Sequence, residues 1–156
     1  MAGMENRIII TEKRVEDSFI KFSGQHPDTI SPLPRSASDR SYFRITQGNH
    51  TYIATHSPDP DETRAFIYLS GHFTSKNLPV PRVLFYDESQ SIYFQSDLGN
   101  TSLYDLIEGD KDLRIPLCKK ALEHLVDFQV KGAEGLDFSY CFPRHSFDSV
   151  SVLWDL

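Results

Sequence analysis

The spacing of hydrophobic positions along the chain changes between a helical period and a strand period. Apolar side chains recur every three to four residues in several segments, and aromatic or β-branched residues cluster in short runs between them. Helices are predicted over residues 11–24, 60–75, 101–106 and 115–130. Strands are predicted in a β-hairpin over residues 42–56 and over residues 82–86 and 91–95.

Turn-forming and capping residues separate these segments. Thr11 and Gly24 are expected to cap and end the first helix, and Thr101 to cap the third. Gly48 stands between the two strands of the hairpin, where glycine tolerates the positive φ that a tight turn needs. Asp59 and Pro60 offer a cap and a first-turn proline for the second helix. The segment over 25–38 is rich in proline and small polar residues, so it is expected to be extended.

This order of elements limits the fold class. A hairpin, a helix and a second strand pair favour an antiparallel sheet with a helix on one face, followed by a helical part. We therefore expect an α+β fold and not a parallel sheet built from alternating βαβ units. The expected division is an N-terminal helical extension over residues 1–29, a sheet-containing lobe over residues 30–97 and a helical part over residues 98–156.

Charge and composition narrow the class of partner. The 156 residues carry 16 basic and 22 acidic side chains, which gives a net charge of −6 at pH 7. The excess of acidic residues is located in the part of the chain after residue 56. The electrostatic field of the whole chain repels polyanions. The two cysteines are too few for a disulfide framework or a zinc cluster. Because no apolar run approaches the ~18 residues of a membrane span, a cytoplasmic protein without a membrane partner is expected.

The stretch SASDRSYFRI, residues 36 to 45, carries the candidate chemistry of the N-terminal half. Arg40 and Arg44 stand there beside the aromatic residues Tyr42 and Phe43. The pattern fits a nucleic-acid surface, an ordinary half-buried strand or a loop that closes over phosphate. The negative net charge disfavours nucleic acid as a partner. In a strand, Tyr42 and Phe43 point to opposite faces, so one is expected in the core and the other on the ligand side.

Three motifs taken together resemble a known family. They are S-A-S-D-R-S-Y-F-R at 36–44, V-P-R-V-L at 80–84 and Q-S-D-L-G at 95–99, with the hairpin and a helix between the first two. Their order and spacing resemble the N-terminal part of the aminoglycoside phosphotransferase and choline kinase-like family, nearest to its cell-wall amino-sugar kinases. The resemblance implies a protein-kinase-like N-lobe, a five-stranded antiparallel sheet plus helix, followed by the first helices of a truncated helical C-lobe.

The resemblance also implies an ATP site and the roles of its residues. The small residues of the loop would let backbone N–H groups approach the phosphates, and the planar fork of Arg40 would reach them as well. The segment that begins at Gln95 would be the hinge whose backbone groups read the adenine edge, with Ile53, Tyr93 and Phe94 as walls of the purine slot. The implied nucleotide-binding residues are Ser36, Ala37, Ser38, Asp39, Arg40, Tyr42, Ile53, Gln95, Ser96, Asp97 and Leu98.

The chain departs from this family in two respects. The strand-three lysine that usually holds the phosphates falls on Thr55 or His56, and Glu62 is the candidate for the usual helix glutamate. No H-x-D-x4-N run is present, and the D-F-Q at residues 127–129 lies inside a predicted helix. We therefore expect no catalytic residues and no metal site in this chain, with Mg²⁺ bound only by a full-length protein that includes the missing C-terminal lobe.

These observations lead to two hypotheses. The first is the nucleotide-binding lobe of an ATP-dependent phosphotransferase that acts on an alcohol group of a sugar or amino sugar and that does not turn over alone. Its partners would be ATP and, in the full-length protein, a small-molecule acceptor. The alternative is a noncatalytic kinase-like module for interaction or regulation, which the missing lysine favours.

Overall fold

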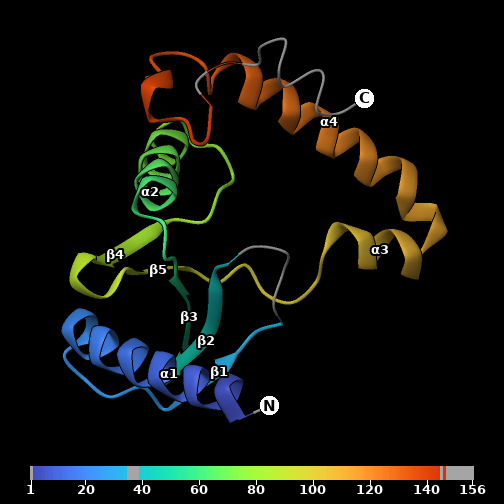
Figure 1. Cartoon of the computed structure of the whole chain (residues 1–156). Coiled ribbons are helices and arrows are strands. Elements are labelled where there is room, and N and C mark those ends of the chain that lie inside the picture. Colours follow the sequence, from blue (N-terminus) through green and yellow to red (C-terminus); the bar gives the residue numbers. More distant parts are fainter. Residues whose placement is uncertain (1, 35–38, 145, 147–156) are drawn as a thin grey trace. The chain divides into compact units, whose positions relative to one another are not determined.

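The computed structural model describes residues 2–34, 39–144 and 146, with side chains from residue 11 onward. The chain forms one five-stranded sheet with helices before, within and after it (Figure 1). The strands are β1 (Thr29–Pro32), β2 (Ser41–Gln47), β3 (His50–His56), β4 (Val83–Asp87) and β5 (Ile92–Ser96). The α-helices are α1 (Ala2–Ser23), α2 (Pro60–Ser75), α3 (Leu103–Gly109) and α4 (Arg114–Val130). Short 3-10 helices occupy Glu88–Gln90, Lys111–Leu113 and Phe138–Tyr140.

The sheet is antiparallel throughout, in the order β1-β2-β3-β5-β4. The predicted hairpin is present, since Gln47 pairs with His50 across a turn in which Gly48 has φ 57°. The predicted strand pair at residues 82–96 is also present, with each strand displaced by one residue. The α+β fold and the five-stranded antiparallel sheet are therefore confirmed. Strand β1, at the edge of the sheet, lies in the proline-rich segment expected to be extended.

Helix α1 covers one face of the sheet and forms the core with it. Val15 and Phe19 are fully buried against the sheet, and the ring of Phe19 lies 5.6 Å from that of Phe94. The sheet residues of the core cluster are Phe43, Ile45, Ala54, Ile92 and Phe94. The helix begins at Ala2 and not at Thr11, so the predicted cap at Thr11 is wrong, whereas it ends at Ser23 with Gly24 at φ 74° as expected.

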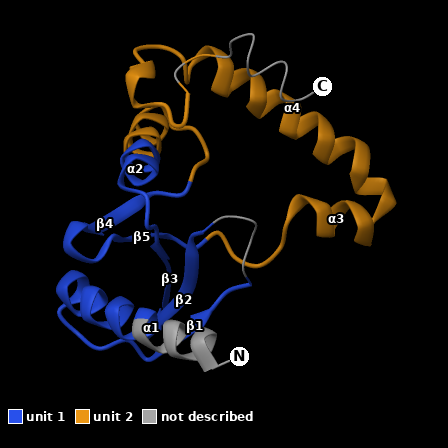
Figure 2. Cartoon of the chain, viewed as in Figure 1, with its two compact units in different colours: residues 1–67, 81–97 blue, residues 68–80, 98–156 orange. Residues whose placement is uncertain are grey.

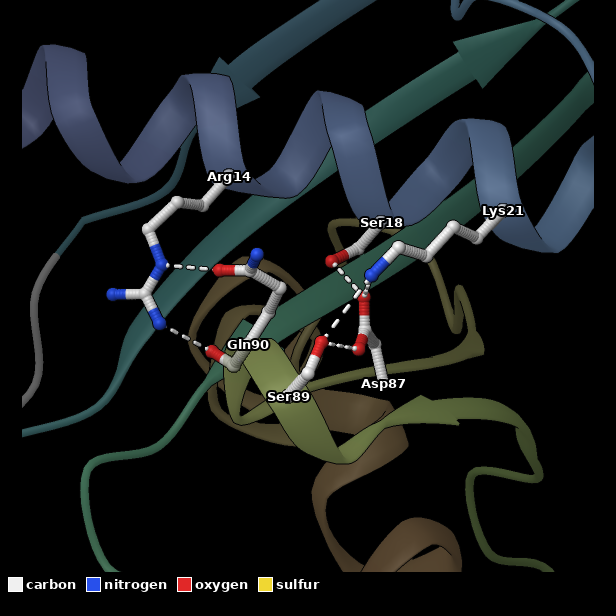
Figure 3. A network of polar contacts seen from close by, with 6 residues as sticks. All are labelled: Arg14, Ser18, Lys21, Asp87, Ser89 and Gln90. Carbon is white, nitrogen blue, oxygen red and sulfur yellow. Dashed lines mark hydrogen bonds and ion pairs between the residues drawn. The ribbon is translucent and has the colours of Figure 1, made fainter.

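A polar network fastens α1 to the end of β4 (Figure 3). The carboxylate of Asp87 accepts hydrogen bonds from Ser18 Oγ at 2.8 Å and from Ser89 Oγ at 2.6 Å, and it pairs with Lys21 Nζ at 2.7 Å. One turn away, Arg14 donates to both the side chain and the backbone carbonyl of Gln90. The helix is thus joined to the sheet by apolar packing on one stripe and by charged contacts beside it.

Helix α2 forms over the predicted residues and begins at the predicted cap. Asp59 Oδ1 accepts from the backbone N–H groups of Asp61 and Glu62. The backbone carbonyl of Asp59 accepts from the Thr63 hydroxyl at 2.9 Å. The two bonds to Asp59 Oδ1 satisfy backbone N–H groups that a helix start leaves open, and they fix the first turn of α2.

The chain divides into two compact units, coloured separately in Figure 2. Unit 1 contains residues 1–67 and 81–97, and unit 2 contains residues 68–80 and 98–156. The division into three domains expected from the sequence stays a prediction.

Within unit 2, α3 is capped by Ser102 in a capping box with Asp105, so the predicted cap at Thr101 is wrong by one residue. Phe73 packs edge-on against Phe128, at a ring distance of 5.2 Å. A Cβ on Gly132 would lie 2.2 Å from the Phe128 carbonyl oxygen, which explains the glycine there. All of α4 is described and none of its residues is buried. On the apolar face expected from the sequence, Leu117 and Phe128 are half-buried, and Ala121 and Leu125 are exposed.

Candidate nucleotide-binding site

The face of the sheet opposite α1 carries two rows of side chains that run across three strands. Strand register places Tyr42 opposite Thr55, and Thr55 opposite Tyr93. Because side chains alternate along a strand, these residues share a face, whereas their neighbours Phe43, Ala54 and Phe94 point into the α1 core. The second row is Arg44, Ile53 and Gln95. We call this surface, with Arg40 beside it, the ligand face.

Arg40 directly precedes β2 and is held by α2. Its Nη2 pairs with Glu62 Oε1 at 3.2 Å, and its guanidinium carbon lies 6.0 Å from the ring centre of Tyr42. A quarter of the Arg40 side chain remains exposed. Burial lowers the pKa of Arg40, but Tyr42, Tyr93 and Glu62 favour the charged form and raise it overall. The site therefore holds a permanent positive charge that solvent, or a ligand, can reach.

Tyr93 is a neighbour of Arg40, and its hydroxyl stays protonated. Its side chain is almost fully buried, and its ring stacks on that of Phe66 at 5.0 Å. Burial raises the pKa of Tyr93, and contacts with Thr55 and Arg40 lower it less than burial raises it. The hydroxyl is therefore a neutral hydrogen-bonding group at physiological pH.

Several buried polar atoms of the ligand face have no hydrogen-bond partner among the described residues. They are Arg40 Nε, Thr55 Oγ1 and Gln95 Oε1. Tyr93 lies near Arg40 and Thr55, but its hydroxyl makes no hydrogen bond with Arg40 Nε or Thr55 Oγ1. An unsatisfied buried polar atom costs about 1–3 kcal/mol, so three of them on one face are a reason to expect a polar ligand. Arg40 Nε can only donate and Gln95 Oε1 can only accept, which fits a ligand with both kinds of group.

Arg44 of the second row forms a two-point ion pair with Asp97. Arg44 Nε donates to Asp97 Oδ2 at 2.6 Å, and Arg44 Nη2 donates to Asp97 Oδ1 at 3.1 Å. Asp97 is only 6% exposed, and Arg44 lies on β2, two strands away from the β5 end that Asp97 follows. The pair therefore ties the end of β5 to β2 across β3. The Asp97 carboxylate is occupied by Arg44, so a nucleotide contact there would use the backbone.

The predicted site residues fall into three groups. Arg40, Tyr42, Ile53 and Gln95 come together on the ligand face. Asp39, Ser96, Asp97 and Leu98 flank these residues in the sequence: Asp39 and Leu98 are exposed, the Ser96 hydroxyl accepts from the Arg82 backbone N–H at 3.0 Å, and Asp97 pairs with Arg44. Ser36, Ala37 and Ser38 lie outside the described residues.

The prediction that Phe94 is a wall of the purine slot is wrong. Phe94 is fully buried in the α1 core, on the opposite face of the sheet from Ile53. The alternation of side chains along β5 carries this information, because Phe94 follows Tyr93 by one residue and must point the other way. The same alternation confirms that Tyr42 and Phe43 separate, with Phe43 in the core.

Two features of the site were less visible in the sequence. The Arg40–Glu62 and Arg44–Asp97 pairs join residues 22 and 53 positions apart, and neither pairing has a local sequence signal. Thr55, at one of the two positions where a lysine was considered, is fully buried and uncharged. The charge on the ligand face is therefore supplied by β2 and the residue before it, and not by β3.

The structure gives two negative findings for the residues that it describes. No group of three or more histidine, cysteine, aspartate or glutamate side chains there could hold a metal ion. No helix in the described part of the chain is long and apolar enough to cross a membrane.

The comparison with protein families decides the classification. The model of a phosphotransferase enzyme family matches residues 29–131, which is more than half of the chain. The chain belongs to this phosphotransferase family. The matched segment contains the whole sheet, α2, α3 and α4, and it excludes α1.

One named protein and one solved structure are similar to this chain. A Pseudomonas aeruginosa protein, N-acetylmuramate/N-acetylglucosamine kinase, is 30% identical over 112 residues, which are 70% of this chain and 32% of that protein. A solved Ralstonia eutropha structure, described as an aminoglycoside phosphotransferase, matches with 10% identity and a TM-score of 0.43 over 59% of this chain and 29% of that one. The chain thus spans about a third of the length of these proteins.

Proposed function

We propose that the chain is the nucleotide-binding lobe of an ATP-dependent phosphotransferase that acts on an alcohol group of a sugar or amino sugar. The observation that carries the proposal is the ligand face, where a charged arginine and three unsatisfied buried polar atoms lie on one side of a sheet. A nucleotide supplies both oxyanions for Arg40 and ring groups of both hydrogen-bonding kinds for the other atoms.

The residues of the site divide between the two ends of such a ligand. Arg40 would bind the phosphate oxygens, because a guanidinium offers several N–H donors in a fixed plane. Ile53, the apolar member of the second row, and the buried part of Gln95 would contact the purine. Asp97, held by Arg44, would fix the backbone at the end of β5 where the purine edge is to be read.

The acceptor in this proposal follows the relatives. The P. aeruginosa protein is named as a kinase of two amino sugars, and an alcohol group of such a sugar is the acceptor that we propose. The chain spans about a third of the length of the proteins that it matches, and we expect Mg²⁺ binding and the phosphoryl-transfer residues only in a full-length protein, with the chain inactive alone. The cytoplasmic location expected from the sequence stays a prediction.

Calorimetric titration of the 156-residue chain with ATP and with adenosine tests the proposal. We expect weak binding of both, and Arg40→Ala is expected to weaken ATP about tenfold to a hundredfold while leaving adenosine unchanged. The control is Arg64→Ala, which removes an exposed arginine of α2 that pairs with Asp61. ATP affinity that is unchanged in Arg40→Ala would rule out the phosphate role of Arg40. Failure to bind either ligand would favour the noncatalytic module.

A further inference from the structure

The ligand face carries two arginines, and their acidic partners hold them in different ways. Arg40 meets Glu62 through one nitrogen, at 3.2 Å. Arg44 donates from Nε and Nη2 to the two carboxylate oxygens of Asp97, at 2.6 Å and 3.1 Å. A guanidinium and a carboxylate bind each other most tightly in this two-point geometry. Arg44 therefore has a partner that it keeps when an anionic ligand enters the site.

The Arg44–Asp97 pair is largely shielded from solvent. Asp97 is 6% exposed and Arg44 is 21% exposed, so water and salt screen the pair less than a surface pair. Without Arg44, the Asp97 carboxylate would be a buried charge with its cation removed. The charge of Arg44 is thus compensated by Asp97 and offers little to a phosphate group. Arg40 differs, because its Nε has no acceptor among the described residues.

The pair lies at the end of the ligand face that is remote from Arg40. Along β2, Arg40 comes before the first row of side chains, whereas Arg44 belongs to the second row. Arg44 is paired in register with Ile53, the apolar residue of that row, and Asp97 follows Gln95 by two residues. The Arg44–Asp97 pair is therefore beside the residues that would contact the purine in the proposed function.

The chain that follows β5 is no longer held by strand pairing. Ser96 is the last residue of β5, and its backbone N–H donates to the Arg82 carbonyl at 3.0 Å. Asp97 and Leu98 belong to no helix or strand, and Gly99 has φ 89°. The side chain of Asp97 ties the first residue beyond the sheet back to β2. Asp97 and Arg44 both belong to unit 1.

We infer that Arg44 is a positioning residue for the base of the nucleotide, which acts through Asp97 and holds the backbone after β5 in place for the purine edge. The inference rests on the proposed function and deepens it, because it gives the two arginines separate tasks. Arg40 contacts the phosphates, and Arg44 sets the affinity for the base. A backbone segment that is ordered before binding loses less conformational entropy when the base arrives.

Calorimetric titration of the 156-residue chain with ATP and with adenosine tests this inference. The proteins are the wild type, Arg44→Gln, Asp97→Asn and the double variant. We expect Arg44→Gln to weaken ATP and adenosine by the same factor, about tenfold, because both ligands carry the base. We also expect the double variant to bind no more weakly than the weaker single variant, because the two residues act through one contact.

Asp87→Asn is the matched control for a loss of stability. Asp87 is, like Asp97, a 6% exposed carboxylate of unit 1 that forms an ion pair, but its partner is Lys21 of α1. This variant is expected to bind both ligands like the wild type. Should Arg44→Gln fail to fold, Arg44→Lys replaces it. The lysine keeps the charge but loses the two-point contact, so it is expected to weaken both ligands several-fold.

The outcomes separate this inference from the proposed function. If Arg44→Gln weakens ATP and leaves adenosine unchanged, Arg44 is a phosphate-binding cation and the inference is wrong, while the nucleotide site stands. The inference is also wrong if neither ligand is weakened, if Asp87→Asn weakens both as much, or if the wild type binds ATP but not adenosine. If the wild type binds neither ligand, the proposed function is wrong and the inference is overturned with it.

Discussion

Asp87 is a buried carboxylate whose charge is needed by the fold and not by the ligand face. It is 6% exposed and receives hydrogen bonds or ion pairing from Ser18, Lys21 and Ser89 (Figure 3). Burial by itself raises the pKa of Asp87, but the three partners outweigh it and lower the pKa to about 2. The folded state therefore favours the ionised form more strongly than the unfolded chain does.

This difference predicts a stability contribution that depends on pH. Because the folded pKa lies below the unfolded value near 4, the contribution is present above pH 4 and is lost as pH falls towards 2. We expect Asp87→Asn to lower the free energy of unfolding at pH 7 by about 2 kcal/mol, and about half of that difference to disappear at pH 3. Urea denaturation at both pH values measures it. Glu88→Gln is the control, since it removes an exposed neighbouring carboxylate, and an equal loss at both pH values in Asp87→Asn would contradict the argument.

At the scale of elements, α1 packs on the sheet and shares its core, although α1 lies outside the segment that matches the family. It provides Val15 and Phe19, both fully buried, to the core cluster. The Phe19 ring has aromatic neighbours on both sides, Phe22 on its own helix and Tyr52 and Phe94 on the sheet. The sheet of this chain thus needs a helix that the family match does not include.

Truncation of Phe19 tests this role of α1. Phe19→Ala removes a fully buried ring and leaves a cavity between helix and sheet, so we expect the free energy of unfolding to fall by about 3–5 kcal/mol. The measurement is urea denaturation followed by circular dichroism. Lys13→Ala changes an exposed position of the same helix and is expected to cost less than about 0.5 kcal/mol. Equal effects of the two substitutions would show that α1 is not part of the core.

The elements also show which parts of the fold the sequence predicts and which parts it does not. The period of apolar residues and the cap at Asp59 predicted α2 over its observed residues, and Gly48 predicted the hairpin turn. The early part of α1, up to residue 10, has no comparable signal and was missed. Alternation along β2 and β5 predicts which residues share the ligand face. It does not predict that Glu62 pairs with Arg40 or that Asp97 pairs with Arg44, because those contacts depend on how the strands and α2 are packed.

At the scale of the whole molecule, buried apolar side chains are unevenly divided between the two units. Among the described residues, the buried hydrophobic side chains lie in unit 1 with the exception of Leu78. Helices α3 and α4 are fully described and contain no buried residue, and α4 exposes Leu122, Leu125 and Val126. Since short helices without tertiary packing are marginal in water, α3 and the first half of α4 have little beyond their own hydrogen bonds to hold them.

Amide hydrogen exchange of the 156-residue chain checks this contrast residue by residue. We expect the amides of β3 and β5 to exchange only on global unfolding, and those of α3 and the first half of α4 to exchange at least about a hundredfold faster. The end of α4 is expected to be slower than its beginning, because Phe128 packs on Phe73 and the Gly132 carbonyl accepts from His72 at 2.7 Å. Uniform protection across both units would contradict this expectation. It would mean that α3 and α4 gain stability from packing that their exposed side chains do not show.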